Sequence, residues 1–176
     1  MLGLLLLVSV QGEIAITEGL ALPSVGRYGR DPFPVDALQQ AMVLGSWRKP
    51  SAGEQVMGLD GKPVAWETLK AGSDGAFTGP AMRGGYLYAA VESPVRKVMI
   101  LEASGHGMAY VNGEPRAGDV YGYGFVKLPV QLKQGRNDLL FQVPRGRLSA
   151  KLTIPKGDAF FNAGDPTLPD YSDNYM

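Results

Sequence analysis

The dipeptide Asn112-Gly113 restricts how this chain can fold more than any other feature. It follows an apolar run at residues 108–111 and precedes the polar residues 114–116. Asn-Gly is typical of two-residue β-hairpin turns, because both central residues of a type I′ turn adopt positive φ. The sequence therefore predicts an antiparallel hairpin at this position.

The second half of the chain carries several runs that alternate in the manner of β-strands. In residues 147–154 every second side chain is apolar, which predicts an inward-facing row of Leu148, Ala150, Leu152 and Ile154. Similar apolar-rich runs, closed by turn-forming residues, occupy residues 86–92, 96–103, 125–132 and 137–143. Strands that recur every ~8–12 residues are typical of a sandwich or jelly roll. The predicted fold class is all-β, an antiparallel β-sandwich or jelly roll.

The run at residues 98–101 differs from the others because four consecutive side chains are apolar. A strand of this kind is typical of the interior of a sheet that is covered on both faces. We therefore expect residues 98–101 to be buried on both sides.

The first half of the chain is less regular. Residues 13–34 contain two Gly-Arg pairs and three prolines, and we expect an extended arm that lies on the domain rather than an element of its own. After it, Asp36 with Gln39 favours a helix cap, whereas the apolar residues 41–44 favour a buried strand. We expect one helical turn that runs into a strand ending near Trp47.

A short strand that carries Trp66 is predicted at residues 64–69, where the side chains alternate. The segments on either side, residues 50–62 and 70–84, are expected to be loops, and Asp60-Gly61 predicts a hairpin-type turn within the first of them. We expect the sandwich domain to occupy residues 35–156.

The two ends of the chain have their own signals. Residues 1–10, MLGLLLLVSV, are apolar but too short to cross a bilayer, which takes ~20 such residues. They predict a signal peptide over residues 1–12 and hence bacterial-type export to the periplasm or outside the cell, with no stable membrane span. Because no Lys or Arg precedes the apolar block, a buried first strand or a wrongly assigned start codon is the alternative.

The polar, proline-containing residues 157–176 predict a linker or tail that leaves the domain. A linker at this place favours a chain that is the front piece of a longer protein. One expectation is therefore a truncated secreted hydrolase, whose activity lies in a missing C-terminal domain.

Composition argues against several kinds of site. The 17 Lys and Arg residues balance 17 Asp and Glu residues, so no net field favours nucleic acid or an anionic membrane. Cysteine is absent and there is one histidine, which excludes a thiol nucleophile, a disulfide and a His-cluster metal site within one chain. We expect no cofactor and no metal.

Three segments, GGYLYAAVES, YVNGEPRAGD and VKLPVQLKQGRNDLLFQV, together resemble β-sandwiches of the galactose-binding-domain-like kind. Such domains are the non-catalytic jelly-roll modules of many secreted bacterial glycoside hydrolases and peptidases. The resemblance covers residues 84–154, with a fainter match at residues 42–45, and the tail sequence DPTLPD looks like a connector to a second domain in such proteins. It implies that the Asn-Gly hairpin and the turn at residues 133–137 serve structure. Many members carry Asp-Asp-Gly where this chain has residues 104–107, SGHG, so ligand or calcium contacts made by those acids do not carry over.

The loop at residues 116–124 is the candidate ligand site. Tyr121 and Tyr123 could stack on a sugar ring, while Arg116 and Asp119 could hydrogen-bond to its hydroxyls. The alternative is that both tyrosines pack over an open end of the sandwich. We expect a non-catalytic accessory module of an exported protein, which binds carbohydrate or packs against a catalytic hydrolase domain.

His106 is a fifth candidate ligand-binding residue beside those of the loop. A small sandwich enzyme that uses His106 is the alternative from another class. Ser104 lies two residues away, but no acid partner, oxyanion donor or Gly-x-Ser-x-Gly motif accompanies the pair. The simpler interpretation is a glycine-flanked turn in which His106 bonds to the backbone. Acidic residues that could form a carboxylate pair are each explained as strand-end or outward-facing charges; they are Glu67, Glu92, Glu102 and Glu114.

Overall fold

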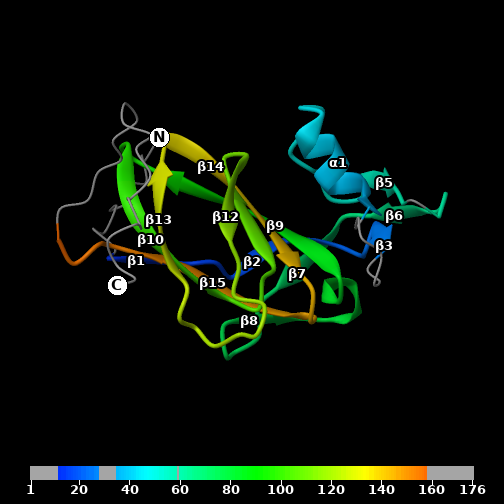
Figure 1. Cartoon of the computed structure of the whole chain (residues 1–176). Helices are drawn as coiled ribbons and strands as arrows, with labels where there is room; N and C mark the ends of the chain where they lie inside the picture. The colour runs from blue at the N-terminus through cyan, green and yellow to red at the C-terminus, as the bar shows by residue number, and fades with distance from the viewer. Residues whose placement is uncertain (1–11, 28–34, 59, 158–176) are drawn as a thin grey trace, which may run out of the picture.

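The computed structural model describes residues 12–27, 35–58 and 60–157. Most of the predicted signal peptide, part of the predicted arm and nearly all of the predicted tail lie outside these residues. The described chain forms two main antiparallel sheets that face each other, which confirms the all-β sandwich (Figure 1).

The first sheet, here sheet A, has five strands. Four follow the order β1-β15-β10-β13, and β8 pairs with β15 on the edge that β1 also uses. Their bounds are β1 (Glu13–Ala15), β8 (Ala76–Thr78), β10 (Lys97–Ser104), β13 (Lys127–Leu132) and β15 (Arg147–Thr153).

The second sheet, here sheet B, has six strands in the order β12-β11-β14-β9-β2-β7. Their bounds are β2 (Glu18–Leu22), β7 (Glu67–Lys70), β9 (Gly85–Ser93), β11 (Met108–Val111), β12 (Glu114–Ala117) and β14 (Gly135–Val143). The predicted hairpin joins β11 to β12, with Asn112 at φ 53° and Gly113 at φ 87°, as a type I′ turn requires.

The main hydrophobic core lies between the two sheets and follows the predicted alternation, except at Ile154. This residue was expected to face inward, but it lies past the end of β15 and is 49 % exposed. Leu148 and Leu152 of β15 are fully buried, as are Leu139, Phe141 and Val143 of β14. The prediction for residues 98–101 is wrong in one respect. Strand β10 is interior to sheet A, but of these four residues only Met99 and Leu101, which face sheet B, are buried, while Val98 and Ile100 on the opposite face are half-buried.

The segment predicted as an arm is extended, but it does not merely lie on the domain. Its residues form β1, which pairs with β15 in sheet A, and β2, which lies between β9 and β7 in sheet B. The backbone of β1 pairs with residues 151–153, and that of β2 pairs with residues 67–70 and 86–88. The partners of both strands thus lie far away in the sequence. The residues of a short strand do not by themselves indicate which distant strand will pair with it.

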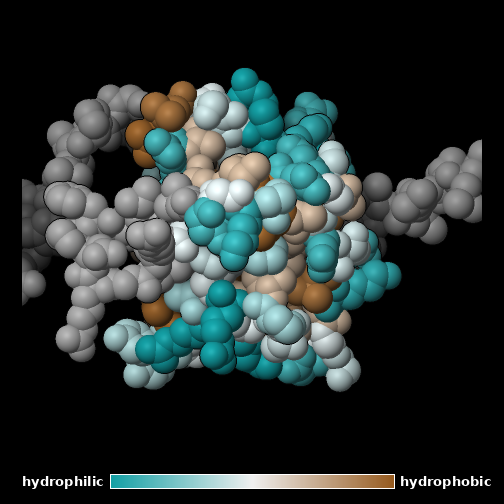
Figure 2. Space-filling view, turned by 90° about the vertical axis from the view of Figure 1, so that its right-hand side faces the viewer, coloured by the Kyte–Doolittle hydropathy of each residue, from teal (hydrophilic) through white to brown (hydrophobic). Residues whose placement is uncertain are grey.

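A third, smaller layer covers part of the outer face of sheet B. It contains α1 (Ala37–Val43), the pair β3 (Gly26–Arg27) and β4 (Val35–Asp36), and the hairpin β5 (Gln55–Met57) and β6 (Pro63–Ala65). Figure 1 shows α1 and this hairpin on one side of the molecule, beside sheet B and far from β10 and β13. Figure 2 views that side, where the largest hydrophobic group lies at the upper left and smaller hydrophobic patches lie lower down among hydrophilic groups.

This layer has its own core, centred on Trp66, which is buried between β6 and β7. It packs with Tyr86 and Tyr88 of β9 and with Leu140 of β14, all on the face of sheet B that points away from sheet A. Strands β9 and β14 therefore carry apolar side chains on both faces. The remaining short element is the 3₁₀ turn η1 (Pro80–Met82).

The prediction for residues 36–47 was half right. Asp36 caps α1, and its side chain accepts hydrogen bonds from the backbone N–H groups of Leu38 at 2.8 Å and Gln39 at 3.0 Å. Residues 41–43 continue the helix instead of forming the expected strand. Strands β5 and β8 lie in segments expected to be loops, whereas the Asp60-Gly61 turn does connect a hairpin, β5 to β6.

Candidate ligand-binding site

The loop at residues 118–126 crosses from β12 in sheet B to β13 in sheet A, and Asp119 shapes it. The Asp119 side chain is buried, and its two oxygens accept hydrogen bonds from the backbone N–H groups of Tyr123 at 3.1 Å and Gly124 at 2.6 Å. The Asp119 carbonyl accepts a further bond from the Gly105 N–H at 2.9 Å. A buried carboxylate that binds backbone N–H groups holds a loop in one conformation.

Three aromatic rings stack on this loop; we call them the aromatic stack. The rings of Tyr121 and Tyr123 lie 5.7 Å apart at 20°, and those of Tyr123 and Phe125 lie 5.9 Å apart at 29°. Their exposed fractions are 65 %, 67 % and 84 %. The Arg145 guanidinium lies 4.6 Å from the centre of the Tyr121 ring, which leaves Phe125 at the other end of the stack.

The exposure of these rings does not fit the alternative that the tyrosines pack over an end of the sandwich. Side chains that served only to close the core would lose most of their accessible surface. Tyr121 and Tyr123 instead present about two thirds of theirs to solvent, on a loop held by Asp119. Contiguous exposed apolar surface of this kind marks binding sites.

The two polar residues predicted to hydrogen-bond to a ligand are already engaged within the protein. Both Asp119 oxygens bind the loop backbone. The Arg116 guanidinium donates to the Glu114 carboxylate at 2.7 Å and to the Pro115 carbonyl at 2.8 Å. The structure thus brings the rings of Tyr121 and Tyr123 together, while Asp119 binds the backbone of their loop. Arg116, on β12, is paired with Glu114.

His106, the fifth predicted residue, is interior. Its exposed fraction is 1 %, and its ring meets that of Phe141 edge-on, with centroids 5.9 Å apart. Burial lowers the pKa of the imidazole below its usual value, and the Ala117 backbone and the Asp119 charge offset this only in part. Among the residues that the structure describes, neither ring nitrogen finds a hydrogen-bond partner of normal geometry, so the contact with the Ala117 backbone is weak.

Close packing of the backbone around His106 explains why glycine stands at positions 105 and 118. Gly105 has φ 89°, and a Cβ atom there would lie 2.0 Å from the Arg147 carbonyl oxygen. At Gly118, a Cβ atom would lie 2.2 Å from the Gly107 oxygen. Residues 105–107 therefore pack against residues 118 and 119, where the aromatic loop begins. The buried imidazole of His106 is shielded from solvent and hence from a dissolved substrate.

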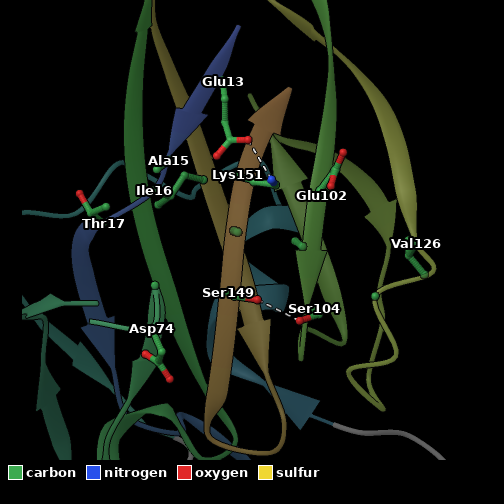
Figure 3. A pocket seen from close by; sticks show the side chains of 14 residues that line it. Glu13, Ala15, Ile16, Thr17, Asp74, Glu102, Ser104, Val126, Ser149 and Lys151 are labelled. Atoms are coloured by element: carbon green, nitrogen blue, oxygen red, sulfur yellow. Dashed lines mark hydrogen bonds and ion pairs between the residues drawn. The ribbon is translucent and has the colours of Figure 1, made fainter. Parts of the chain in front are cut away.

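A hollow of about 340 Å³ lies on the outer face of sheet A (Figure 3). Figure 3 shows Glu13 of β1, Lys151 of β15 and Glu102 of β10 side by side. Ser149 lies further along β15, and Ser104 lies further along β10. Asp74 and Thr17 lie on one side of this row and Val126 on the other. Gly124 and Val126 of the aromatic loop also line the hollow, and they flank Phe125 in the chain.

The polar side chains in the hollow are bound to one another. Lys151 Nζ donates to Glu13 at 2.8 Å, and the hydroxyl groups of Ser104 and Ser149 lie 3.0 Å apart. Glu102 accepts a hydrogen bond from Thr153 at 3.0 Å and lies 3.5 Å from Lys127 Nζ. At the lower rim Arg147 donates to Asp74 at 3.0 Å.

These contacts favour the ionised forms of Glu102 and Lys151. The Thr153 hydrogen bond, followed by Lys127 and Lys151, lowers the pKa of Glu102 below its usual value. The Glu13 carboxylate raises the pKa of Lys151. Neither group is adjusted to exchange protons near pH 7, which general acid–base catalysis would require.

Within the described ranges, no group of three or more His, Cys, Asp or Glu side chains could hold a metal ion. In the same part of the chain, no helix is long and apolar enough to cross a membrane.

Sequence reasoning missed Phe125 and the hollow. The signal for Phe125 was present, since Tyr121, Tyr123 and Phe125 are spaced two residues apart, and an extended segment puts such residues on one side. For the hollow, residues 147–154 were correctly expected to point Ser149 and Lys151 outward. The register that sets them beside Ser104 and Glu102 comes only from the pairing of β15 with β10.

No protein-family model matches the chain, and no curated protein is similar to it in sequence.

Proposed function

We propose that this protein is a non-catalytic β-sandwich module of an exported protein, and that it binds carbohydrate through the aromatic stack. The observation that carries the proposal is the set of three stacked, largely exposed rings of Tyr121, Tyr123 and Phe125. Sugar rings have apolar C–H faces that pack on flat aromatic surfaces, and aromatic side chains with a few polar neighbours are typical of small-ligand sites.

The rigidity of the loop supports this proposal. Asp119 binds two backbone N–H groups of the loop, and each ring is held by the next one. A surface that is ordered before the ligand arrives loses little conformational entropy on binding. The resemblance of residues 84–154 to galactose-binding-like modules points to the same function, as does the sandwich architecture.

Interior placement of His106 favours a binding module over an enzyme that would use this residue. The imidazole is shielded from solvent, and its ring contact is with Phe141 rather than with a carboxylate. A general base must reach the proton that it removes, directly or through one water.

A second candidate function is packing against a catalytic partner domain. Val43 and Leu44, at the end of α1, are among the most exposed apolar side chains of the described chain. Exposed apolar residues can mark protein–protein contacts. This candidate predicts that Val43→Ser with Leu44→Ser would weaken a domain interface and leave sugar binding unchanged.

Affinity electrophoresis and pull-down on insoluble polysaccharides test the carbohydrate proposal. Cellulose, chitin, xylan and a galactan serve as probes for the wild type and for Tyr123→Ala and Phe125→Ala. We expect binding to at least one of them and a loss of about tenfold in affinity in both variants, because a stacking contact contributes up to about 1.5 kcal/mol and tenfold corresponds to about 1.4 kcal/mol.

Val95→Ala is a matched control, since Val95 is another exposed apolar residue outside the aromatic loop. It should bind as the wild type does, and all variants should unfold within a few degrees of it. Absence of binding to every polysaccharide, or equal binding by wild type and Phe125→Ala, would reject the proposal.

A further inference from the structure

The hollow on sheet A and the aromatic stack are adjacent along the chain. Gly124 and Val126 line the hollow, and Phe125 stands between them in the chain. Adjacent residues are separated by only ~3.5 Å along an extended chain. A ligand on the Phe125 ring therefore lies within reach of the hollow.

The carboxylates that line the hollow are each paired with a cation. Glu13 lies 2.8 Å from Lys151, which also lines the hollow, while Glu102 and Asp74 pair with Lys127 and Arg147, which stand outside the lining. Because each carboxylate has a cationic partner, the electrostatic preference of the hollow for an anion or a cation is small. Its occupant is better described as an uncharged polar molecule.

The groups of the hollow match the hydroxyl groups of a sugar. Each hydroxyl both donates and accepts hydrogen bonds. Each of these groups uses only part of its capacity within the protein: Lys151 Nζ bonds to Glu13 and keeps further N–H donors, and the carboxylates of Glu13 and Glu102 keep further acceptor positions. The hydroxyl groups of Ser104 and Ser149, which bond to each other, can also donate and accept. These residues project from β1, β10 and β15, so the strand pairing fixes their spacing.

The volume also suits a ligand of this class. Sites for small molecules generally measure ~300–1,000 Å³, and the hollow measures about 340 Å³. The rings of the aromatic stack lie outside the set of residues that line this space.

We propose that the hollow is a second sugar-binding region next to the aromatic stack, so that the ligand is a chain of several sugar units and not a single terminal sugar. This inference rests on the proposed carbohydrate-binding function. The aromatic stack binds one unit by its apolar face, and the row Glu13, Lys151, Glu102 binds hydroxyl groups of a neighbouring unit.

Titration calorimetry with fragments of the bound polysaccharide tests the inference. The monosaccharide and the hexasaccharide are compared on the wild type, Lys151→Met and Ser149→Ala. We expect the wild type to bind the hexasaccharide at least tenfold more tightly than the monosaccharide. Each hollow variant should lose about threefold to tenfold in hexasaccharide affinity, with little change for the monosaccharide.

Lys70→Met is the matched control. Like Lys151, Lys70 is paired with a glutamate on a neighbouring strand, here Glu18 at 3.5 Å, but it belongs to sheet B. It should leave both affinities unchanged. In ¹⁵N NMR spectra of the wild type, the hexasaccharide should shift the amide signals of Ser149 and Lys151 as well as those of the aromatic loop.

Two negative results are distinguishable. If Phe125→Ala abolishes hexasaccharide binding while Lys151→Met and Ser149→Ala bind normally, the hollow is not part of the site and the inference is wrong, although the proposed function stands. If the wild type binds no saccharide, the proposed function itself fails, and the inference fails with it.

Discussion

The side-chain amide of Asn112 donates a hydrogen bond of 2.9 Å to the side-chain oxygen of Asn137. This bond joins the β11–β12 turn to the turn that leads from β13 into β14. The same Asn137 oxygen accepts from the Lys133 N–H at 2.8 Å, and its amide donates to the carbonyls of Lys133 at 3.0 Å and Gly135 at 2.9 Å. Two turns that are local features of the sequence are thus locked together in the fold.

Asn137→Ala should lower the free energy of unfolding by about 3 kcal/mol, because it removes a fully buried side chain that binds three partly buried backbone groups of the turn. Chemical unfolding followed by circular dichroism measures this loss. Arg136→Ala, at the exposed neighbouring position, is the control and should cost much less. A loss below 1 kcal/mol in Asn137→Ala would mean that water replaces the missing bonds.

Substitutions at Asn112 separate the turn conformation from its hydrogen bonds. Asn112 has positive φ and also accepts a bond from the Asp138 N–H at 3.1 Å. Asn112→Gly keeps the turn and removes only the bonds, so we expect a loss of about 1 kcal/mol. Asn112→Ala adds backbone strain and should lose about 1 kcal/mol more in the same unfolding experiment. Equal losses of unfolding free energy in the two variants would show that the positive φ at position 112 does not affect stability.

Asp119→Ala should loosen the aromatic loop, because the N–H groups of Tyr123 and Gly124 lose their acceptor. We expect a weaker near-ultraviolet circular dichroism signal from the stacked tyrosines and a stability loss of about 1–2 kcal/mol. Asp119→Asn keeps one acceptor oxygen and should give an intermediate signal. An unchanged tyrosine signal in Asp119→Ala would show that ring stacking alone orders the loop.

Stability should fall in mild acid because of His106. Burial holds its pKa below the usual value of 6.5. Above pH 6.5 the imidazole is neutral in both the folded and the unfolded chain, and its titration contributes nothing. As the pH falls below 6.5, the unfolded chain binds a proton that the buried ring does not bind, so the free energy of unfolding decreases.

The pH effect of His106 is measurable by comparison with His106→Gln, which cannot titrate. Between pH 6.5 and pH 5 the wild type should lose stability more steeply, by at most about 1.4 kcal/mol per pH unit. Parallel curves for the two proteins would contradict the buried, neutral state of this residue.

Trp66→Ala should destabilise the whole protein and not only the layer around α1. Trp66 is almost fully buried, and its ring meets that of Tyr88 edge-on with centroids 6.5 Å apart. Because Tyr88 belongs to β9 in the middle of sheet B, we expect one cooperative transition with a loss of about 3–5 kcal/mol. Trp66→Phe should lose less. A separate early transition, with the sheets unaffected, would show that the α1 layer folds independently.

The strands of the second half were predictable because their signals are local. Alternation placed Leu148 and Leu152 inward, and the Asn-Gly and Lys133–Asn137 turns marked where strands end. The segments that became β1, β2 and α1 carried weaker signals. Their form depends on distant partners, such as Tyr88 opposite Leu20 in β2.

The candidate site shows the same division. Sequence alone identified Tyr121 and Tyr123, since aromatic residues in a glycine-rich loop are conspicuous in any sequence. It did not show that Asp119 points inward and His106 is buried, because a polar side chain near a turn fits either a ligand site or a buried bond.

Sequence by itself therefore determined the class of the fold, since side-chain period and turn chemistry act over a few residues and do not depend on the rest of the chain. Only the tertiary structure decided which strands are neighbours, and with them the hollow where Lys151 meets Glu13 and Glu102. The reason is that strand pairing uses the same backbone groups in every strand. Register is chosen by the fit of side chains that lie far apart in sequence.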